Sequence, residues 1–147
     1  MEGTGKIIGV DLGLKRVGVS ISDQTNSLAS PLDHVAYEGP RKLAAYLTEL
    51  AAKYGATSFV VGLPKNMDGT VGQAGKRALR FAELLRSHSG LPVSLEDERL
   101  TTSQAEKEMI DLGKSRHLRK KTIDGAAAVL ILENHLRAAR MRTKEGQ

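Results

Sequence analysis

Cysteine and tryptophan are both absent from this 147-residue chain, and aromatic side chains are scarce. Without cysteine there is no disulfide, no thiolate nucleophile and no cysteine-based zinc site. Three tyrosines and two phenylalanines are too few to predict an aromatic platform that stacks unpaired bases. If the chain binds nucleic acid, we therefore expect the contacts to be mainly with phosphates.

Long hydrophobic runs are also missing. The longest uninterrupted run, Ala126 to Leu132, has seven residues, whereas a membrane-spanning helix needs about 20. The chain opens Met1-Glu2-Gly3 without a basic stretch followed by a long apolar one, so we see no secretory signal. We expect a cytoplasmic protein with no membrane partner.

The charge balance is basic. Lys and Arg total 22 against 17 Asp and Glu, a formal net charge of +5, which favours association with a polyanion. The length predicts a single domain. We assign residues 1–140 to that domain and interpret residues 141–147 as a frayed basic tail.

An apolar hairpin carries the first candidate functional residue. Ile7, Ile8 and Val10 lead into Asp11, and Val17, Val19 and Ile21 then alternate with small residues, as in a second strand. Asp11 therefore ends a buried strand, where an ionised group is costly unless a metal or hydrogen-bond donors stabilise it. The alternative is an ordinary turn aspartate, followed by glycine two residues later.

The remaining pattern alternates strands with helices and predicts an α/β fold with parallel crossovers. A third strand with Pro31 suits a sheet edge. A loop rich in turn-forming residues follows the fourth strand, where ligand sites of parallel sheets collect. The predicted elements are strands at 28–37, 57–62 and 91–95, helices at 40–54, 73–87 and 102–112, a loop at 63–72, and a final helix capped by Thr122.

Further acids stand at the ends of predicted elements. Glu96, Asp97 and Glu98 follow the last strand, and Asp124 lies in the first turn of the last helix. Helix capping and the helix dipole explain one acid before a helix, and also Asp124, but three adjacent acids repel one another. With Asp11, Glu98 and Asp124 form a carboxylate set suited to Mg²⁺ or Mn²⁺ and to phosphodiester hydrolysis.

Four segments resemble motifs of the YqgF/RuvX family, which are bacterial nucleases of the RNase H-like superfamily related to RuvC resolvases. They cover essentially the whole chain in order, with Ser20 and Gly125 as small departures from the family pattern. The resemblance implies an RNase H-like fold, a mixed five-stranded sheet that begins with antiparallel hairpin strands, continues with parallel crossovers and is flanked by helices on both faces. The segments are Gly9–Asp23, Val60–Gly72, Asp97–Thr102 and Ile123–Leu132.

The resemblance also implies a metal-dependent endonuclease. Asp11, Glu98 and Asp124 match the family's acids, and Asp97 is an alternative to Glu98 because a one-residue shift reverses the direction of a strand side chain. We hypothesise that Asp11 bridges two metal ions and that Glu98 and Asp124 each complete one coordination sphere. The candidate phosphate contacts are Lys15, Arg16, Lys65, Asn66, Arg99, Lys114, Arg116, Arg119, Lys120 and Lys121.

Several alternatives stay open at this point. The family is associated both with maturation of the 5′ end of pre-16S ribosomal RNA and with Holliday junction resolution, and RNA and branched DNA present the same phosphates. A resolvase needs two active sites and a trimming enzyme needs one, so either a monomer or a homodimer fits. The rival functions are a nucleic-acid-binding or assembly factor without turnover and an actin-like nucleotide-binding domain. The basic run 114–121 has its own alternative, a solvated loop.

Overall fold

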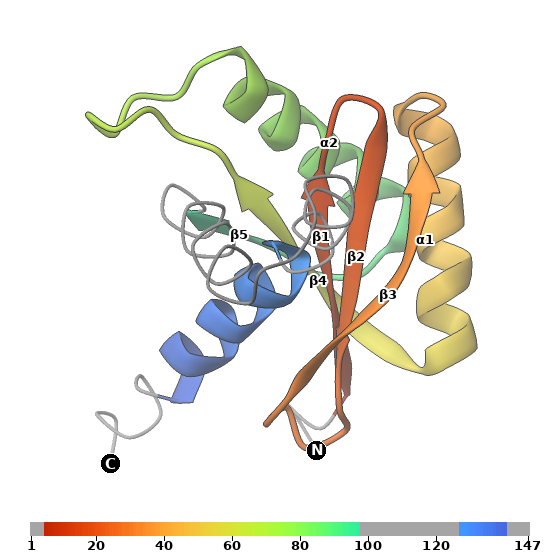
Figure 1. The fold of residues 1–147 in the computed structure, drawn as a ribbon. Helices are drawn as coiled ribbons and strands as arrows, with labels where there is room; N and C mark the ends of the chain where they lie inside the picture. Colours follow the sequence, from red (N-terminus) through yellow and green to blue (C-terminus); the bar gives the residue numbers. More distant parts are fainter. Residues whose placement is uncertain (1–4, 98–126, 141–147) are drawn as a thin grey trace, which may run out of the picture.

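The computed structural model describes residues 5–97 and 127–140, which form one sheet covered by helices on both faces (Figure 1). A helix covers residues 127–140. The elements before it are β1 (Lys6–Leu12), β2 (Arg16–Ser22), β3 (Ala29–Ala36), α1 (Pro40–Tyr54), β4 (Ala56–Leu63), α2 (Gln73–Ser89) and β5 (Val93–Asp97).

The described strands form a five-stranded sheet in the order β3-β2-β1-β4-β5. β2 pairs antiparallel with both β1 and β3, and β4 pairs parallel with both β1 and β5. This mixed sheet confirms the predicted arrangement of a hairpin followed by parallel crossovers. β3 lies at one edge, and its Pro31, which has no amide hydrogen to donate, sits in that edge strand.

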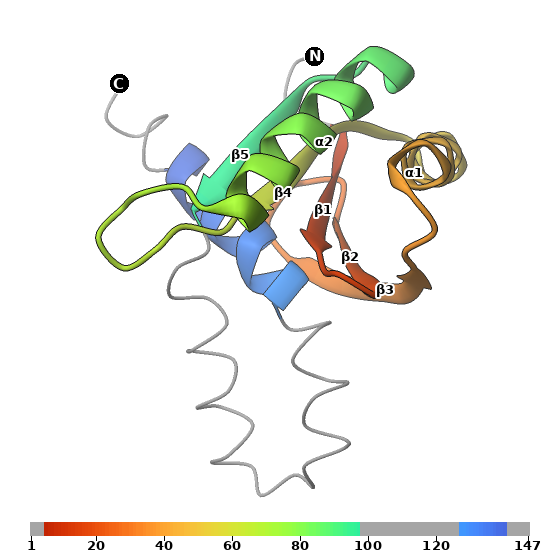
Figure 2. The same cartoon turned by 90° about the horizontal axis from the view of Figure 1, so that it is seen from above.

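Two apolar layers hold the helices against the sheet (Figure 2). α1 and α2 cover one face, where Leu47 and Leu85 pack with strand residues such as Ile8 and Val61. The 127–140 helix covers the opposite face through Ile131, Leu132 and Leu136, which pack with Val60. Side chains of a strand point alternately to its two faces, so β1 and β4 are buried from both sides, as their nearly continuous apolar sequence indicates.

Two glycines end the long helices where the sequence predicts an end. Gly55 and Gly90 both adopt φ of 73°, and each donates its amide to the carbonyl four residues earlier. This left-handed conformation is accessible to glycine without the penalty that a Cβ imposes. α1 also begins at the predicted Pro40, whose fixed φ suits the first turn of a helix.

The predicted boundaries of the last strand are wrong by two residues. β5 runs Val93–Asp97, not 91–95, and Val93 is the first residue in register with β4. Pro92 only accepts a hydrogen bond, from the amide of Phe59 at 3.0 Å, and its ring nitrogen offers no donor to a ladder. Glu96 and Asp97 are consequently strand residues with defined faces. The predicted helix at 102–112, the run 114–121, Thr122 and the tail lie outside the described residues.

No helix within the described ranges is both long and apolar enough to cross a membrane.

The β2–β3 turn is organised by one carboxylate. Asp23 Oδ1 accepts the amides of Ser27 at 2.7 Å and Leu28 at 3.1 Å, and Oδ2 accepts the Thr25 hydroxyl at 2.9 Å. The Leu28 and Ser27 amides hold the pKa of Asp23 below its ordinary value of 3.8. Because the folded-state pKa is lowered, the stabilisation is present above the unfolded value and is lost as pH falls through the folded one.

We therefore expect Asp23→Asn to lower the free energy of unfolding near neutral pH and to have much less effect in acid. Urea unfolding of both proteins at a series of pH values should show a stability difference that is largest above about pH 4 and closes on further acidification. A difference that stays constant through this range would contradict the assigned role of the carboxylate charge.

Candidate active site at the carboxyl edge of the sheet

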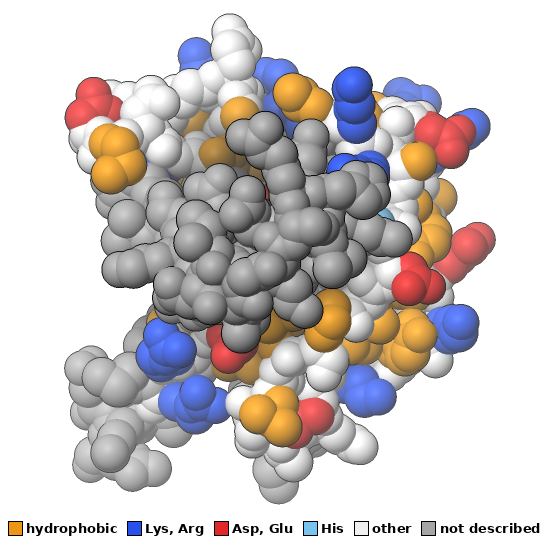
Figure 3. Space-filling model, in the orientation of Figure 1, with side chains coloured by type: hydrophobic (Ala, Val, Ile, Leu, Met, Phe, Trp, Pro, Cys, Tyr) orange, Lys and Arg blue, Asp and Glu red, His pale blue; other side chains and the backbone are white. Residues whose placement is uncertain are grey.

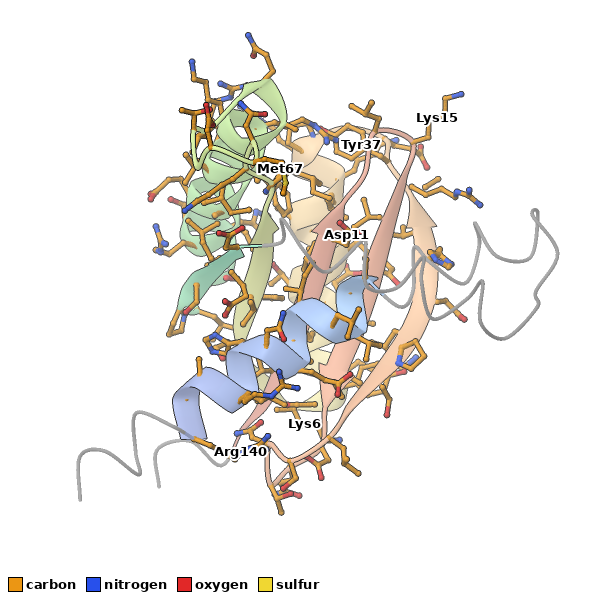
Figure 4. All side chains as sticks on the ribbon, turned by 60° about the vertical axis from the view of Figure 1, so that its left-hand side comes forward. Lys6, Asp11, Lys15, Tyr37, Met67 and Arg140 are labelled. Atoms are coloured by element: carbon orange, nitrogen blue, oxygen red, sulfur yellow. The ribbon has the colours of Figure 1, made fainter. Side chains whose placement is uncertain are left out.

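Asp11 is a half-buried residue near the end of the central strand β1. It lies opposite Gly18 of β2, and it shares its face of the sheet with Ile7 and Gly9 because alternate residues point the same way. Ile7 packs with the 127–140 helix, so Asp11 is on the face that this helix covers. Figure 4 shows Asp11 beside the first turn of the described helix.

The register of β4 and β5 divides the three adjacent acids between the two faces. Glu96 pairs with Gly62 and Asp97 pairs with Leu63. Leu63 packs with the α1/α2 core, so Asp97 is on the α1/α2 face, and Glu96 is on the Asp11 face. Glu96 Oε1 lies 3.6 Å from His135 Nδ1 of the 127–140 helix. Glu98 is the next residue, but it lies outside the described residues.

Asp124 also lies outside the described residues. The helix at 127–140, which follows it in sequence, is packed against the sheet. Ala127 and Ala128 are buried, and the Ser20 hydroxyl donates to the Ala128 carbonyl at 2.8 Å. Ser20 is opposite Gly9, which precedes Asp11 by two residues. The first described turn of the helix is thus anchored over β1 and β2 close to Asp11.

The two predicted cations of the hairpin are exposed. Lys15 lies between the strands and Arg16 is the first residue of β2. Figure 4 shows Lys15 at the tip of the hairpin, projecting to solvent. Both residues are at the end of β1 that carries Asp11, so the hairpin brings positive charge to the same edge of the sheet as the acid.

The loop after β4 begins at the same edge of the sheet. Hydrogen bonds between its own residues hold its conformation. The Asn66 amide nitrogens N and Nδ2 donate to the carbonyl and hydroxyl oxygens of Thr70, both at 2.8 Å. The Thr70 amide and hydroxyl donate to Asp68 Oδ1 at 3.0 and 2.7 Å. Asn66, predicted as a substrate contact, therefore also has a structural function inside the loop. Met67 stands at the tip with 77% of its surface exposed, and Lys65 is half-buried.

Arg77 of α2 is a site residue that the sequence interpretation missed. Its guanidinium donates to the carbonyls of Gly13 at 2.9 Å and Leu12 at 3.4 Å, and it lies 4.4 Å from the centre of the Tyr37 ring. The Tyr37 amide in turn donates to the Lys15 carbonyl at 2.8 Å. The turn after Asp11 is therefore held from the α1/α2 side. No local pattern predicts the two hydrogen bonds, since the carbonyls of Leu12 and Gly13 are more than 60 residues from Arg77 in sequence.

We expect Arg77→Met to lower the free energy of unfolding by about 2 kcal/mol, the scale of hydrogen bonds from a charged donor together with an aromatic contact. Arg77→Lys should recover only part of this loss, because an ammonium lacks the planar fork that reaches two carbonyls. Urea unfolding measures the loss, and amide exchange at residues 13–15 should accelerate. The exposed Arg80→Met is the matched control, and an equal loss there would contradict the assignment.

Among the described residues, no group of three His, Asp or Glu side chains is arranged to hold a metal ion. Two of the three predicted ligands are outside this part of the chain. The donor that is described does fit a hard divalent cation, because Asp11 presents a partly buried carboxylate at an element end. The residue types of Glu98 and Asp124 supply the same oxygen chemistry.

A mixed sheet with this strand order, an acid on its central strand and the 127–140 helix packed beside that acid define a domain of the RNase H-like fold class. The family model described as "RuvX: Holliday junction resolvase" matches residues 5–138, and the chain belongs to this family. It is therefore a nuclease, a hydrolase that acts on the phosphodiester bonds of nucleic acid.

Curated relatives are similar over nearly their full length. A protein from Pelotomaculum thermopropionicum is 45% identical over 132 residues, covering 89% of this chain and 86% of the relative. A protein from Listeria innocua is 44% identical over 133 residues, covering 89% and 96%. Both carry the name "Putative pre-16S rRNA nuclease".

Solved resolvase structures share the fold. Thermus thermophilus RuvC in complex with a Holliday junction substrate aligns with a TM-score of 0.61 at 16% identity, covering 95% of this chain and 97% of that one. Fowlpox virus resolvase in complex with Holliday junction DNA aligns with a TM-score of 0.58 at 11% identity, covering 91% and 98%. The two structural alignments confirm the RNase H-like fold. At such low sequence identities they do not show a shared substrate.

Proposed function

We propose that this chain is a divalent-metal-dependent endonuclease that trims the 5′ end of precursor 16S ribosomal RNA, with Asp11, Glu98 and Asp124 as its metal ligands. The placement of Asp11 carries the proposal. It is a half-buried carboxylate on the central strand, on the face and at the end of the sheet where the 127–140 helix is anchored. Asp124 precedes the described part of that helix by three residues.

The register supports Glu98 over Asp97 as the acid from β5. Asp97 shares a face with Leu63 and the α1/α2 core, away from Asp11. A ligand set must converge on one point, so an acid on the opposite face is a poor partner for Asp11. Glu96 is on the correct face but is next to His135, which gives it a partner on the 127–140 helix.

The choice of RNA as substrate rests on the nearer relatives. Relatives named for pre-16S rRNA are 40–45% identical, whereas the two junction-bound resolvases are 16% and 11% identical. The scarcity of aromatics agrees with binding through phosphates, which does not require stacked, unpaired bases.

The proposed chemistry divides between the acids and the cations. When bound, Mg²⁺ or Mn²⁺ would activate a water and stabilise the charge on the phosphate. Asp11 is on the face that the 127–140 helix covers, because it alternates along β1 with Ile7, which packs with that helix. Lys15, Arg16 and Lys65 hold the substrate by its phosphates at the same edge. Figure 3 shows Lys and Arg side chains along the upper edge of this face.

We predict that Asp11→Asn and Glu98→Gln each lower cleavage of precursor 16S rRNA in Mg²⁺ by at least ~100-fold, the scale of losing one group that stabilises transition-state charge. Asp97→Asn is the matched control and should cleave at nearly the wild-type rate, because Asp97 faces the other side of the sheet. Initial rates on a labelled precursor measure all three. If Asp97→Asn loses activity and Glu98→Gln keeps it, Asp97 is the metal ligand and Glu98 is not.

The cations of the hairpin should contribute to the salt dependence of nucleic-acid binding. Replacing Lys15 and Arg16 together by Gln should reduce the slope of log affinity against log salt by about 1.4 to 1.8, since each phosphate contact contributes about 0.7 to 0.9. Lys53→Gln is the control. Lys53 lies in the last turn of α1, just before β4 begins beside Lys6, so it is at the end of the sheet opposite to Asp11. Equal slopes in wild-type and double-variant protein would show that the hairpin cations do not contact phosphates.

The substrate itself is tested by offering precursor 16S rRNA and a four-way DNA junction to one preparation, with the Asp11→Asn protein beside it. Faster Mg²⁺-dependent cutting of the RNA supports the proposal, and faster cutting of the junction replaces RNA with branched DNA. Binding of either without any metal-dependent cutting would leave an assembly factor as the better description.

A further inference from the structure

The sheet and the 127–140 helix approach each other so closely at Gly9 that no side chain fits there. A Cβ added to Gly9 would lie 2.4 Å from Ser20 Oγ, 3.1 Å from Leu132 Cβ and 3.2 Å from the Ala128 carbonyl oxygen. Carbon and oxygen atoms in contact need more room than this. Any larger residue at position 9 must therefore push the helix away from β1 or displace Ser20.

A hydrogen bond fixes the helix at the same point. The Ser20 hydroxyl donates to the Ala128 carbonyl at 2.8 Å across 108 residues of sequence, and both residues are fully buried. A carbonyl oxygen has two lone pairs, so Ala128 can accept this bond in addition to one from the helix ladder. The contact therefore adds a connection between β2 and the helix and does not replace a backbone bond.

The two contacts involve residues that are close in sequence to two of the proposed metal ligands. Gly9 precedes Asp11 by two residues and is on its face of the sheet, and Ala128 follows Asp124 by four residues. The same few atoms thus link the strand that carries one ligand to the helix that follows another. Mg²⁺ demands near-ideal ligand geometry at about 2.0–2.1 Å, so a shift of this helix by about 0.5 Å is enough to degrade such a site.

We propose that Ser20 and Gly9 are positioning residues that set the separation between Asp11 and Asp124 and thereby the affinity of the site for its divalent ion. Gly9 sets how closely the helix can approach, and Ser20 sets where along β1 and β2 it docks. This inference rests on the proposed function, because the separation between Asp11 and Asp124 affects ion binding only if both acids bind the ion.

The chain offers a matched pair of variants to test this. Ser22 is also a buried serine, on the same strand and the same face as Ser20, but its hydroxyl accepts the Ile7 amide and donates to Asn26, both at 2.7 Å, near the opposite end of β1. Ser22→Ala leaves the Ile7 amide without this acceptor, so it should cost at least as much stability as Ser20→Ala. A general loss of stability would therefore affect both variants.

The readout is the affinity for Mn²⁺ alone, followed by the electron paramagnetic resonance of the free ion, with no substrate present. We expect Ser20→Ala to bind Mn²⁺ about 10-fold more weakly, the scale of removing a group that orients a ligand, and Ser22→Ala to bind as wild type does. Ser20→Cys keeps a donor, but a weaker one on a larger atom, and should also bind Mn²⁺ more weakly than wild type; it replaces Ser20→Ala if that protein does not fold.

Gly9→Ala should weaken Mn²⁺ binding more strongly than Ser20→Ala. Because the nearest obstructing atom is Ser20 Oγ, the double variant with Ser20→Ala should lose less affinity than the two single effects combined. Additive losses would show that Gly9 and Ser20 do not act at one contact.

Two acid variants separate the failure of this inference from the failure of the proposed site. Asp11→Asn and Asp124→Asn must lose Mn²⁺ binding if the site is correct. If they do and Ser20→Ala binds like wild type, or Ser22→Ala loses as much as Ser20→Ala, the positioning inference is overturned and the site stands. If neither acid variant changes Mn²⁺ binding, the proposed metal site is overturned as well.

Discussion

The pairing of β1 on both of its edges is the constraint on which the rest of this structure depends. β1 is antiparallel to β2 on one side and parallel to β4 on the other, so its backbone is bonded along most of its length and both of its faces are covered. Strand pairing fixes the backbone near the end of this strand, where Asp11 pairs with Gly18 of β2. Asp11 occupies that position, and the hairpin turn and the loop after β4 approach the same edge.

The region around Asp11 is held from both faces by polar contacts to backbone carbonyls. On one face Arg77 reaches the carbonyls of Leu12 and Gly13. On the other face the Ser20 hydroxyl reaches the Ala128 carbonyl. Both donors are at least partly buried, where a hydrogen bond is stronger than in water and an unpaired group is expensive. The fold thus restrains the acid-bearing strand end through polar side chains that do not themselves belong to the proposed ligand set.

Much of this fold could be predicted from residue pattern, and the parts that could not share one cause. The hairpin, the parallel crossover and the glycine helix ends follow from local periodicity and local conformation. The start of β5 was misplaced because Leu91 and Pro92 look like strand residues until pairing with β4 is known. The hydrogen bonds of Arg77 could not be predicted, because the carbonyls of Leu12 and Gly13 are more than 60 residues from it in sequence. Ser20 looked like a small strand residue for the same reason.

Residue order alone predicts three oxygen ligands at the ends of elements and excludes thiolate chemistry, because these are properties of residue type and of local spacing. Tertiary structure decided which acids can meet. Glu96 and Asp97 are adjacent in sequence, yet the β4–β5 register assigns them to opposite faces. Tertiary structure also decided how near the last helix comes to β1, through a glycine and a serine whose partners are distant in sequence. Both decisions depend on pairing and packing between remote segments, which no local pattern specifies.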